Sequence, residues 1–137
     1  MPSLPPAIAE ERFAQARVGR LATVTALGRP HVVPVCFVLH EDRVFTAVDA
    51  KPKATTALAR LENVRATGRA SVLVDHYEED WASLWWVRVD GVARIEQSAG
   101  ALDALAAKYE QYRSARPAGP VIAIDPERWS SWVASEP

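Results

Sequence analysis

Apolar positions change their spacing along the chain, and each change marks an expected element. In IAEERFAQARVG, Ile8, Phe13 and Ala16 share one helical face before Gly19, so this stretch predicts a short amphipathic helix. From residue 20 to residue 49 the pattern becomes extended and rich in β-branched residues, and the turn signals ALGRP and HED divide it. This pattern predicts three strands in an antiparallel meander.

The middle of the chain returns to helical and then to extended spacing. Leu58 and Leu61 in KATTALARLENVRA predict a helix that ends at TGR, and ASVLVD resumes an extended pattern. The run LWWVRVDGVARIE alternates strictly, which predicts a strand with a kink or bulge at Gly91. Adjacent tryptophans on a strand point to opposite faces, so Trp85 is expected in the core and Trp86 on the other face.

The last third predicts one helix and one strand. SAGALDALAAKYEQYRS has its large apolar residues along a single helical stripe, and GPVIAIDPERWSSWVA adds a strand that ends in a short turn after Asp125. About six strands with helices inserted between them, and no βαβ rhythm, predict an α+β fold that is mainly β. The expected architecture is an antiparallel barrel with peripheral helices.

The composition is that of one domain without disulfides, expected over residues 1–137 with loose termini at 1–7 and 134–137. The single cysteine, Cys36, has no intramolecular partner, and no charged-then-apolar leader begins the chain, so a cytoplasmic location is expected. A formal net charge of −1 argues against a nucleic-acid partner. No apolar run approaches the roughly 18 residues of a membrane-spanning helix.

Several common catalytic motifs are absent from the sequence. It has no G-x-G-x-x-G, no P-loop and no Cys/His spacing typical of zinc sites, and its three histidines stand apart. Classical dinucleotide folds, NTPases and metal hydrolases are therefore disfavoured, and no metal is expected. Spacing alone does not decide on a Ser/His/Asp triad, but no nucleophile elbow is present.

Two local features call for an explanation. Pro34 lies inside the second expected strand, where it cannot donate to a ladder, so this strand is expected to be an edge, to bulge or to leave a ladder position open. Lys51 and Lys53 are two of the three lysines in the chain, and they bracket Pro52 where a strand pattern gives way to a helix pattern. A solvated turn is one interpretation of this lysine pair.

The order and spacing of several segments carry a resemblance to a known family. GRLATVTALGRPHVVPVCFVLHEDRVFTAVDAKPK, ARLENVRATGRASVLVD and WWVRVDGVARI resemble the pyridoxamine-phosphate-oxidase-like, flavin-binding split-barrel superfamily. Within it, they are most similar to the actinobacterial probable coenzyme F420-dependent enzymes, over residues 10 to 133. The resemblance implies a split β-barrel and a homodimer with two cofactor sites at the dimer interface. The arginine and lysine set of true pyridoxamine phosphate oxidases is not matched, so vitamin B6 oxidation is disfavoured.

The resemblance also implies a set of cofactor-binding residues. Backbone groups of two strands would face the ring, and cations with the first turn of a helix would bind a phosphate. The implied residues are His31, Val33, Pro34, Val35, Thr46, Ala47, Val48, Lys51, Lys53, Thr55, Trp86 and Arg88. For several of them another role is open: Pro34 as a proline that protects an edge, His31 as an exposed turn residue, and Trp86 as a purely structural interface residue.

The expected function is that of a homodimeric oxidoreductase that uses coenzyme F420. Hydride would pass between the deazaflavin C5 and a small organic substrate, and no acid or base is assigned. An FMN-dependent oxidase or reductase on the same fold is the alternative. A third possibility, from another class, is a non-catalytic protein that binds a flavin or haem.

Overall fold

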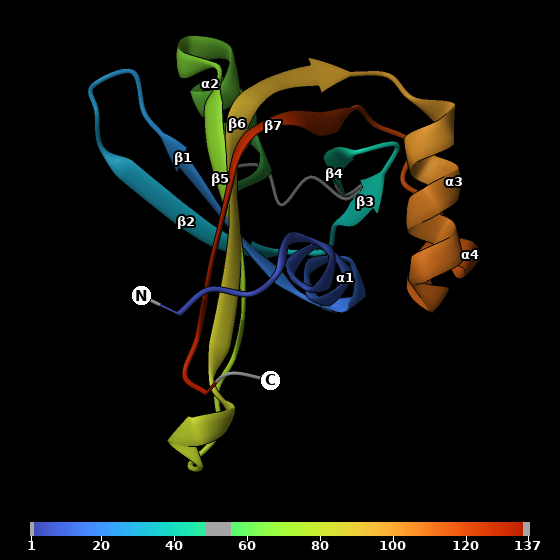
Figure 1. Cartoon of the computed structure of the whole chain (residues 1–137). Helices are drawn as coiled ribbons and strands as arrows, with labels where there is room; N and C mark the ends of the chain where they lie inside the picture. Colours follow the sequence, from blue (N-terminus) through green and yellow to red (C-terminus); the bar gives the residue numbers. More distant parts are fainter. Residues whose placement is uncertain (1, 49–55, 136–137) are drawn as a thin grey trace.

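A computed structural model describes residues 2–48 and 56–135 of the chain. In these residues seven strands form one antiparallel sheet in the order β2-β1-β5-β6-β7-β4-β3, which curls into a half-barrel (Figure 1). The strands are β1 Gly19–Val24, β2 Pro30–Val35, β3 Val38–His40, β4 Arg43–Ala47, β5 Arg69–His76, β6 Trp85–Glu96 and β7 Val121–Val133. The helices are α1 Pro6–Gln15, α2 Thr56–Thr67, α3 Ala99–Lys108 and α4 Glu110–Ser114, with a 3-10 turn η1 at Trp81–Ser83.

Local chemistry explains where the helices begin and end. α1 starts on prolines, whose missing N–H costs nothing in a first turn. The Ser98 hydroxyl caps α3 by accepting the Ala101 N–H at 3.1 Å. α2 ends at Gly68, which has a φ of +64° and donates its N–H to the Val64 carbonyl at 2.9 Å. The expected end of α2 at TGR is therefore confirmed.

The core lies on the concave face of the sheet. Alternate residues of the central strands point inward and are fully buried, as are Phe13 of α1 and Phe37 between β2 and β3. The Phe13 ring contacts the rings of Phe37 and Trp129 at centroid distances of 4.9 and 5.2 Å. A second, smaller cluster lies under α3, around Leu105 and Tyr109. Trp85 packs against the main core and Trp86 lies on the opposite face, as expected.

The long β6–β7 hairpin bends at Gly91, and this bend determines the shape of the sheet. The register shifts between Asp90 and Gly91, and Gly91 lies opposite Pro126. A Cβ added at Gly91 would lie 2.2 Å from the Asp125 carbonyl oxygen, a distance that no side chain tolerates. Before the bend β6 pairs with β5, and beyond it residues 121–124 of β7 pair with β4. The predicted bulge is confirmed.

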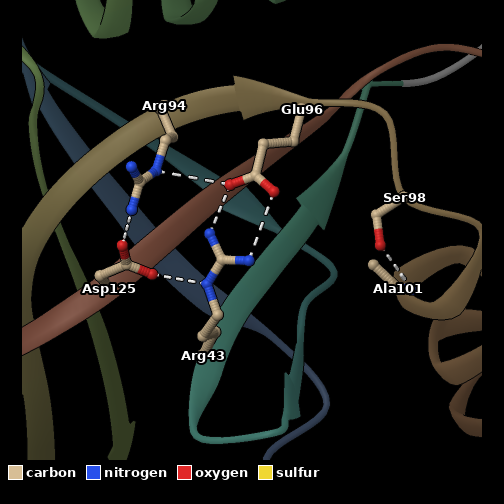
Figure 2. A network of polar contacts seen from close by, with 6 residues as sticks. All are labelled: Arg43, Arg94, Glu96, Ser98, Ala101 and Asp125. Atoms are coloured by element: carbon tan, nitrogen blue, oxygen red, sulfur yellow. Dashed lines mark hydrogen bonds and ion pairs between the residues drawn. The ribbon is translucent and has the colours of Figure 1, made fainter.

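Four charged side chains tie β4, β6 and β7 together beyond the bend (Figure 2). Arg43 donates from both terminal nitrogens to Glu96, and from Nε to Asp125 at 2.5 Å. Arg94 contacts the same two carboxylates. The hydrogen bond from Arg43 and the charges of both arginines hold the pKa of Glu96 below its usual range, although partial burial opposes this.

The predicted meander is wrong. β2 and β3 follow each other in sequence but lie at opposite edges of the sheet, and β4 pairs with β3 and β7 rather than continuing from β2. The extended run from residue 30 to residue 40 is interrupted at Cys36 and Phe37, which belong to no strand. The β-branched pattern continues across this break because β2 and β3 both bury apolar side chains, so the sequence gives no sign of it.

Two expectations for the last third are also corrected. The stripe from residue 98 to residue 114 is two helices, because Tyr109 has extended backbone angles of φ −119° and ψ 122°. The last strand does not end at Asp125 but runs through to Val133. A proline usually ends a strand, and Pro126 therefore favoured an end near Asp125. It lies instead at the bulge opposite Gly91, where a missing N–H is tolerated.

Replacing Gly91 with alanine is expected to destabilise the fold by at least about 2 kcal/mol, because either the β7 backbone or the bend must move. Urea unfolding measures the change. Gly100→Ala is the matched control: its nearest neighbour would be the His40 Nε2 atom at 3.6 Å, and alanine suits a helical position. Equal stability of Gly91→Ala and the wild type would contradict the role of the bend.

Candidate functional site

A hollow of about 240 Å³ lies between the edge strand β2 and strand β4. It brings together four of the residues implied by the sequence: Pro34, Val35, Thr46 and Ala47. Its full lining consists of Val18, Pro34, Val35, Cys36, Thr46, Ala47, Arg60 and Tyr112. The hollow therefore lies between β2, at one end of the curled sheet, and β4, the strand next to the other end.

Pro34 occupies a free sheet edge beside the hollow. β2 pairs only with β1 in the described sheet, with Pro34 opposite Arg20. The Thr25 N–H donates to the Arg29 carbonyl at 2.9 Å, so in the regular antiparallel alternation Pro34 belongs to a non-hydrogen-bonded pair. Its backbone nitrogen faces away from β1, and no ladder bond is lost. The predicted edge position is confirmed.

Strand β4 forms the opposite wall. The Val48 N–H donates to the Pro120 carbonyl at 3.4 Å, so the alternation directs the N–H of Ala47 to the other side, away from β7. The Thr46 hydroxyl donates to the Cys36 carbonyl at 2.8 Å and so links the two walls. The site thus presents a backbone edge and small side chains, with the exposed thiol of Cys36 at its border.

Side chains from α3 and its C-terminal end hold the connection between the two walls. The Tyr109 hydroxyl accepts the Phe37 N–H at 3.1 Å and lies within hydrogen-bond distance of the Phe37 and Arg17 carbonyls. Lys108 donates from Nζ to the Phe37 carbonyl at 2.9 Å and lies 3.9 Å from the centre of its ring. These bonds replace the strand pairing that Phe37 lacks.

Burial perturbs both of these titratable groups. Removal from water, together with the charge of Arg17, lowers the pKa of Lys108 to about 8. Burial also raises the pKa of Tyr109, although its hydrogen bond to Phe37 opposes this. The connection between β2 and β3 is therefore held by a lysine that titrates not far above neutral pH.

Sequence reasoning missed Arg60, which lines the hollow from α2. Its Nε atom is buried and has no hydrogen-bond partner among the described residues. On the same helix, Asn63 donates to the Thr23 hydroxyl at 3.0 Å, and the Thr67 hydroxyl donates to the Asn63 carbonyl at 2.9 Å. A polar stripe of Arg60, Asn63 and Thr67, at spacings of three and four beside the apolar Leu61 and Val64, was the available signal.

The other implied residues lie elsewhere or outside the described residues. Val33 and Val48 pack against the main core. His31 lies on β2 opposite Thr23 and does not line the hollow. Its buried Nδ1 atom has no hydrogen-bond partner in residues 2–48 and 56–135. Lys51, Lys53 and Thr55 fall in the segment from residue 49 to residue 55, which is outside the described residues.

Trp86 and Arg88 lie on the convex face of the sheet and not in the hollow. The Arg88 guanidinium carbon is 5.7 Å from the centre of the Trp86 ring, and Trp132 is the cross-strand partner of Trp86. The same face carries Val32 and Val24, which are 60% and 37% exposed. We call Val24, Val32 and the half-buried Trp86 and Trp132 the convex apolar face, which they share with the charged residues Arg20, Asp75 and Arg88.

Comparison with known proteins identifies the family. A model of the family described as Pyridoxamine 5'-phosphate oxidase matches residues 4–133, nearly the whole chain. The chain belongs to this family. No curated protein matches the sequence.

Solved structures share the fold. A conserved hypothetical protein from Mycobacterium tuberculosis superposes with a TM-score of 0.77 at 20% identity, covering 96% of this chain and 86% of that one. An FAD-binding protein from Mesorhizobium loti has a TM-score of 0.70 at 21% identity, with 95% of each chain covered. The FAD-binding protein from Mycobacterium smegmatis has a TM-score of 0.65 at 16% identity, covering 96% of this chain and 97% of that one.

Two further findings concern what the described residues contain. They include no group of three or more His, Cys, Asp or Glu side chains placed to hold a metal ion. They also include no helix that is long and apolar enough to span a membrane.

The lowered pKa of Lys108 predicts a pH dependence of stability. Because the lysine pKa is about 10.4 in an unfolded chain and about 8 in this fold, the unfolded chain binds the proton more tightly between these values. The free energy of unfolding should therefore rise with pH above 8, by at most about 1.4 kcal/mol per pH unit.

Lys108→Met removes this contribution. Urea unfolding of both proteins at pH 7, 8 and 9 should show the wild type gaining stability relative to the variant as pH rises. This range lies below the tyrosine pKa of about 10, so Tyr109 adds little. Parallel profiles for the two proteins would contradict the lowered pKa.

Proposed function

We propose that this protein is an oxidoreductase that binds a flavin-type cofactor in the hollow between β2 and β4. Coenzyme F420 is the proposed cofactor and FMN the alternative, and the substrate is a small organic molecule. Membership of the Pyridoxamine 5'-phosphate oxidase family supports the reaction class. Two proteins of similar fold are described as FAD-binding, which supports a flavin-type ring as the ligand.

One observation carries the assignment: the hollow joins two strand edges whose backbone faces it. A planar tricyclic ring needs apolar contacts together with a few backbone donors and acceptors, and these walls combine apolar side chains with two strand edges. Pro34 removes one donor from the β2 edge, and Ala47 is small enough to let a ring approach the β4 edge.

The chain's own residues would position the ring and exclude water. Pro34 and Val35 would contact it from one side, and the backbone of Ala47 from the other. The cofactor supplies the hydride chemistry when bound. The link from Thr46 to Cys36 keeps the two walls at a constant separation, which is how the fold would maintain reactive geometry.

Lys51 and Lys53 are proposed to bind the cofactor phosphate. The support is their place in the sequence. They lie between Ala47 of β4 and Arg60 of α2, and both of these residues line the hollow. A phosphate near the start of a helix is favoured by the helix N–H groups and by neighbouring lysines.

A homodimer is proposed to complete the site. A hollow of about 240 Å³ falls below the roughly 300 Å³ at which ligand pockets begin, so one chain encloses only part of a tricyclic cofactor. The convex apolar face of Val24, Val32, Trp86 and Trp132 supplies a surface that association would bury.

Side-by-side titration with F420 and FMN tests the proposed function. F420 is expected to bind in the micromolar range or tighter and to be reduced or oxidised in the presence of a substrate. FMN binding with a yellow purified protein would move the assignment to the alternative. Binding without any turnover across a substrate panel would favour a carrier, and absence of binding by both cofactors would overturn the proposal.

Lys53→Ala is expected to weaken F420 binding by roughly ten- to a hundredfold, because it removes a charge-assisted hydrogen bond of about 1.5–3 kcal/mol. Fluorescence titration at low salt measures the change. Arg65→Ala is the control, since Arg65 is exposed on α2 and pairs with Glu62 at 3.7 Å. Equal affinity of Lys53→Ala and the wild type would return the lysine pair to the role of a solvated turn.

The protein is expected to elute as a dimer in size-exclusion chromatography at micromolar concentration. Trp86→Glu should shift it toward monomer, because a carboxylate would be buried in the interface. Trp81→Glu is the control, since Trp81 is 66% exposed and lies outside the convex face. A wild-type monomer that binds the cofactor tightly would contradict the dimer proposal.

A further inference from the structure

We propose that Arg60 binds an oxyanion, a phosphate or a carboxylate, of the molecule that occupies the hollow. This inference rests on the proposed function for the location of the ligand, but its chemistry follows from Arg60 itself. The ligand would then carry a negative group inside the hollow.

The first support is an unused donor. A guanidinium has five N–H donors, and a buried donor without a partner costs roughly 1–3 kcal/mol. The Nε atom of Arg60 is buried and has no partner within the described part of the chain, although the side chain lines the hollow. Nε and one terminal nitrogen form the side edge of the guanidinium, which matches the two oxygens of a phosphate or carboxylate.

Other arginines of the described chain show what Arg60 lacks. Arg43 forms ion pairs with Glu96 and Asp125, and Arg65, five residues beyond Arg60 on α2, contacts Glu62. No carboxylate is among the described residues that line the hollow. Within residues 2–48 and 56–135, no ion pair of Arg60 is found. The positive charge of Arg60 therefore faces a small hollow whose described lining contains no acidic side chain.

The other described lining residues carry no carboxylate. Their polar side chains are those of Thr46, Cys36 and Tyr112, and the Thr46 hydroxyl donates to the Cys36 carbonyl. In such surroundings a charged partner is worth more than it is in water. An incoming oxyanion would satisfy the Nε donor and balance the charge at once.

The fold holds Arg60 in place from behind. Asn63 is only 6% exposed, and its bond to the Thr23 hydroxyl fixes α2 against β1. Arg60 lies one helical turn before Asn63, on the same side of α2. The position of the Arg60 backbone at the hollow is therefore set by a buried hydrogen bond.

Inorganic phosphate is the first probe, because it tests Arg60 without requiring any cofactor. Thermal unfolding of the wild type, Arg60→Gln and Arg65→Gln is followed in chloride and in phosphate at equal ionic strength and pH. Phosphate is expected to raise the melting temperature of the wild type and of Arg65→Gln, and to have little effect on Arg60→Gln. Arg60→Lys should keep part of the effect, since it retains the charge but loses the two-point geometry.

FMN and riboflavin distinguish the two sources of the oxyanion, since they differ only in the phosphate. If Arg60 binds the cofactor phosphate, the wild type prefers FMN by about tenfold or more, and Arg60→Gln loses that preference. If it binds a substrate carboxylate, the preference for FMN is unchanged in Arg60→Gln while the stabilisation by inorganic phosphate is lost.

The inference is overturned if phosphate stabilises Arg60→Gln as much as the wild type, or stabilises neither. It is also overturned if Arg60→Gln unfolds far more easily than the wild type in chloride, because Arg60 would then serve an internal partner. Failure of both F420 and FMN to bind would overturn the proposed function alone, while the phosphate experiment would still report on Arg60.

Discussion

The close approach of Gly91 to the Asp125 backbone is the constraint on which the architecture depends. It lets a twelve-residue strand and its thirteen-residue partner bend together, so that one hairpin serves two parts of the sheet. Without the bend, β7 would have no reason to meet β4, and the two sheet edges would not face each other. The ion pairs of Arg43 with Glu96 and Asp125 hold β4 against the parts of β6 and β7 that lie beyond the bend. The bend and these ion pairs together position the β4 wall of the hollow.

Helices and strands with regular apolar spacing could be predicted from the sequence, whereas features that depend on contacts between distant residues could not. The α2 helix and the β6 strand with its bulge are encoded by spacing and by a glycine, which act over a few residues. The break at Phe37 depends instead on Tyr109 and Lys108, more than seventy positions away in the chain. A run of β-branched residues contains no sign of such a partner, so the meander was the natural but incorrect expectation.

Part of the candidate site could likewise be predicted from the sequence, and part could not. The edge position of Pro34 follows from the chemistry of proline, and the resemblance led to the strand residues that line the hollow. Arg60 was missed because an arginine on a helix is ordinarily a surface residue. Only its environment, a buried donor beside a hollow whose described lining has no acidic group, separates it from Arg65 on the same helix. Residue type and spacing do not carry that information.

The pairing of β4 with β7 places Val44 opposite Ile124. These two strands are far apart in the sequence. During synthesis, β4 leaves the ribosome long before its partner exists, and only the short β3 hairpin can cover it. Val44 and Phe45, which are buried in the folded protein, are therefore exposed to water or to transient contacts until β7 is synthesised. The split architecture thus makes the pairing of β4 with β7 a late step of folding, since it must wait for β7 to be synthesised.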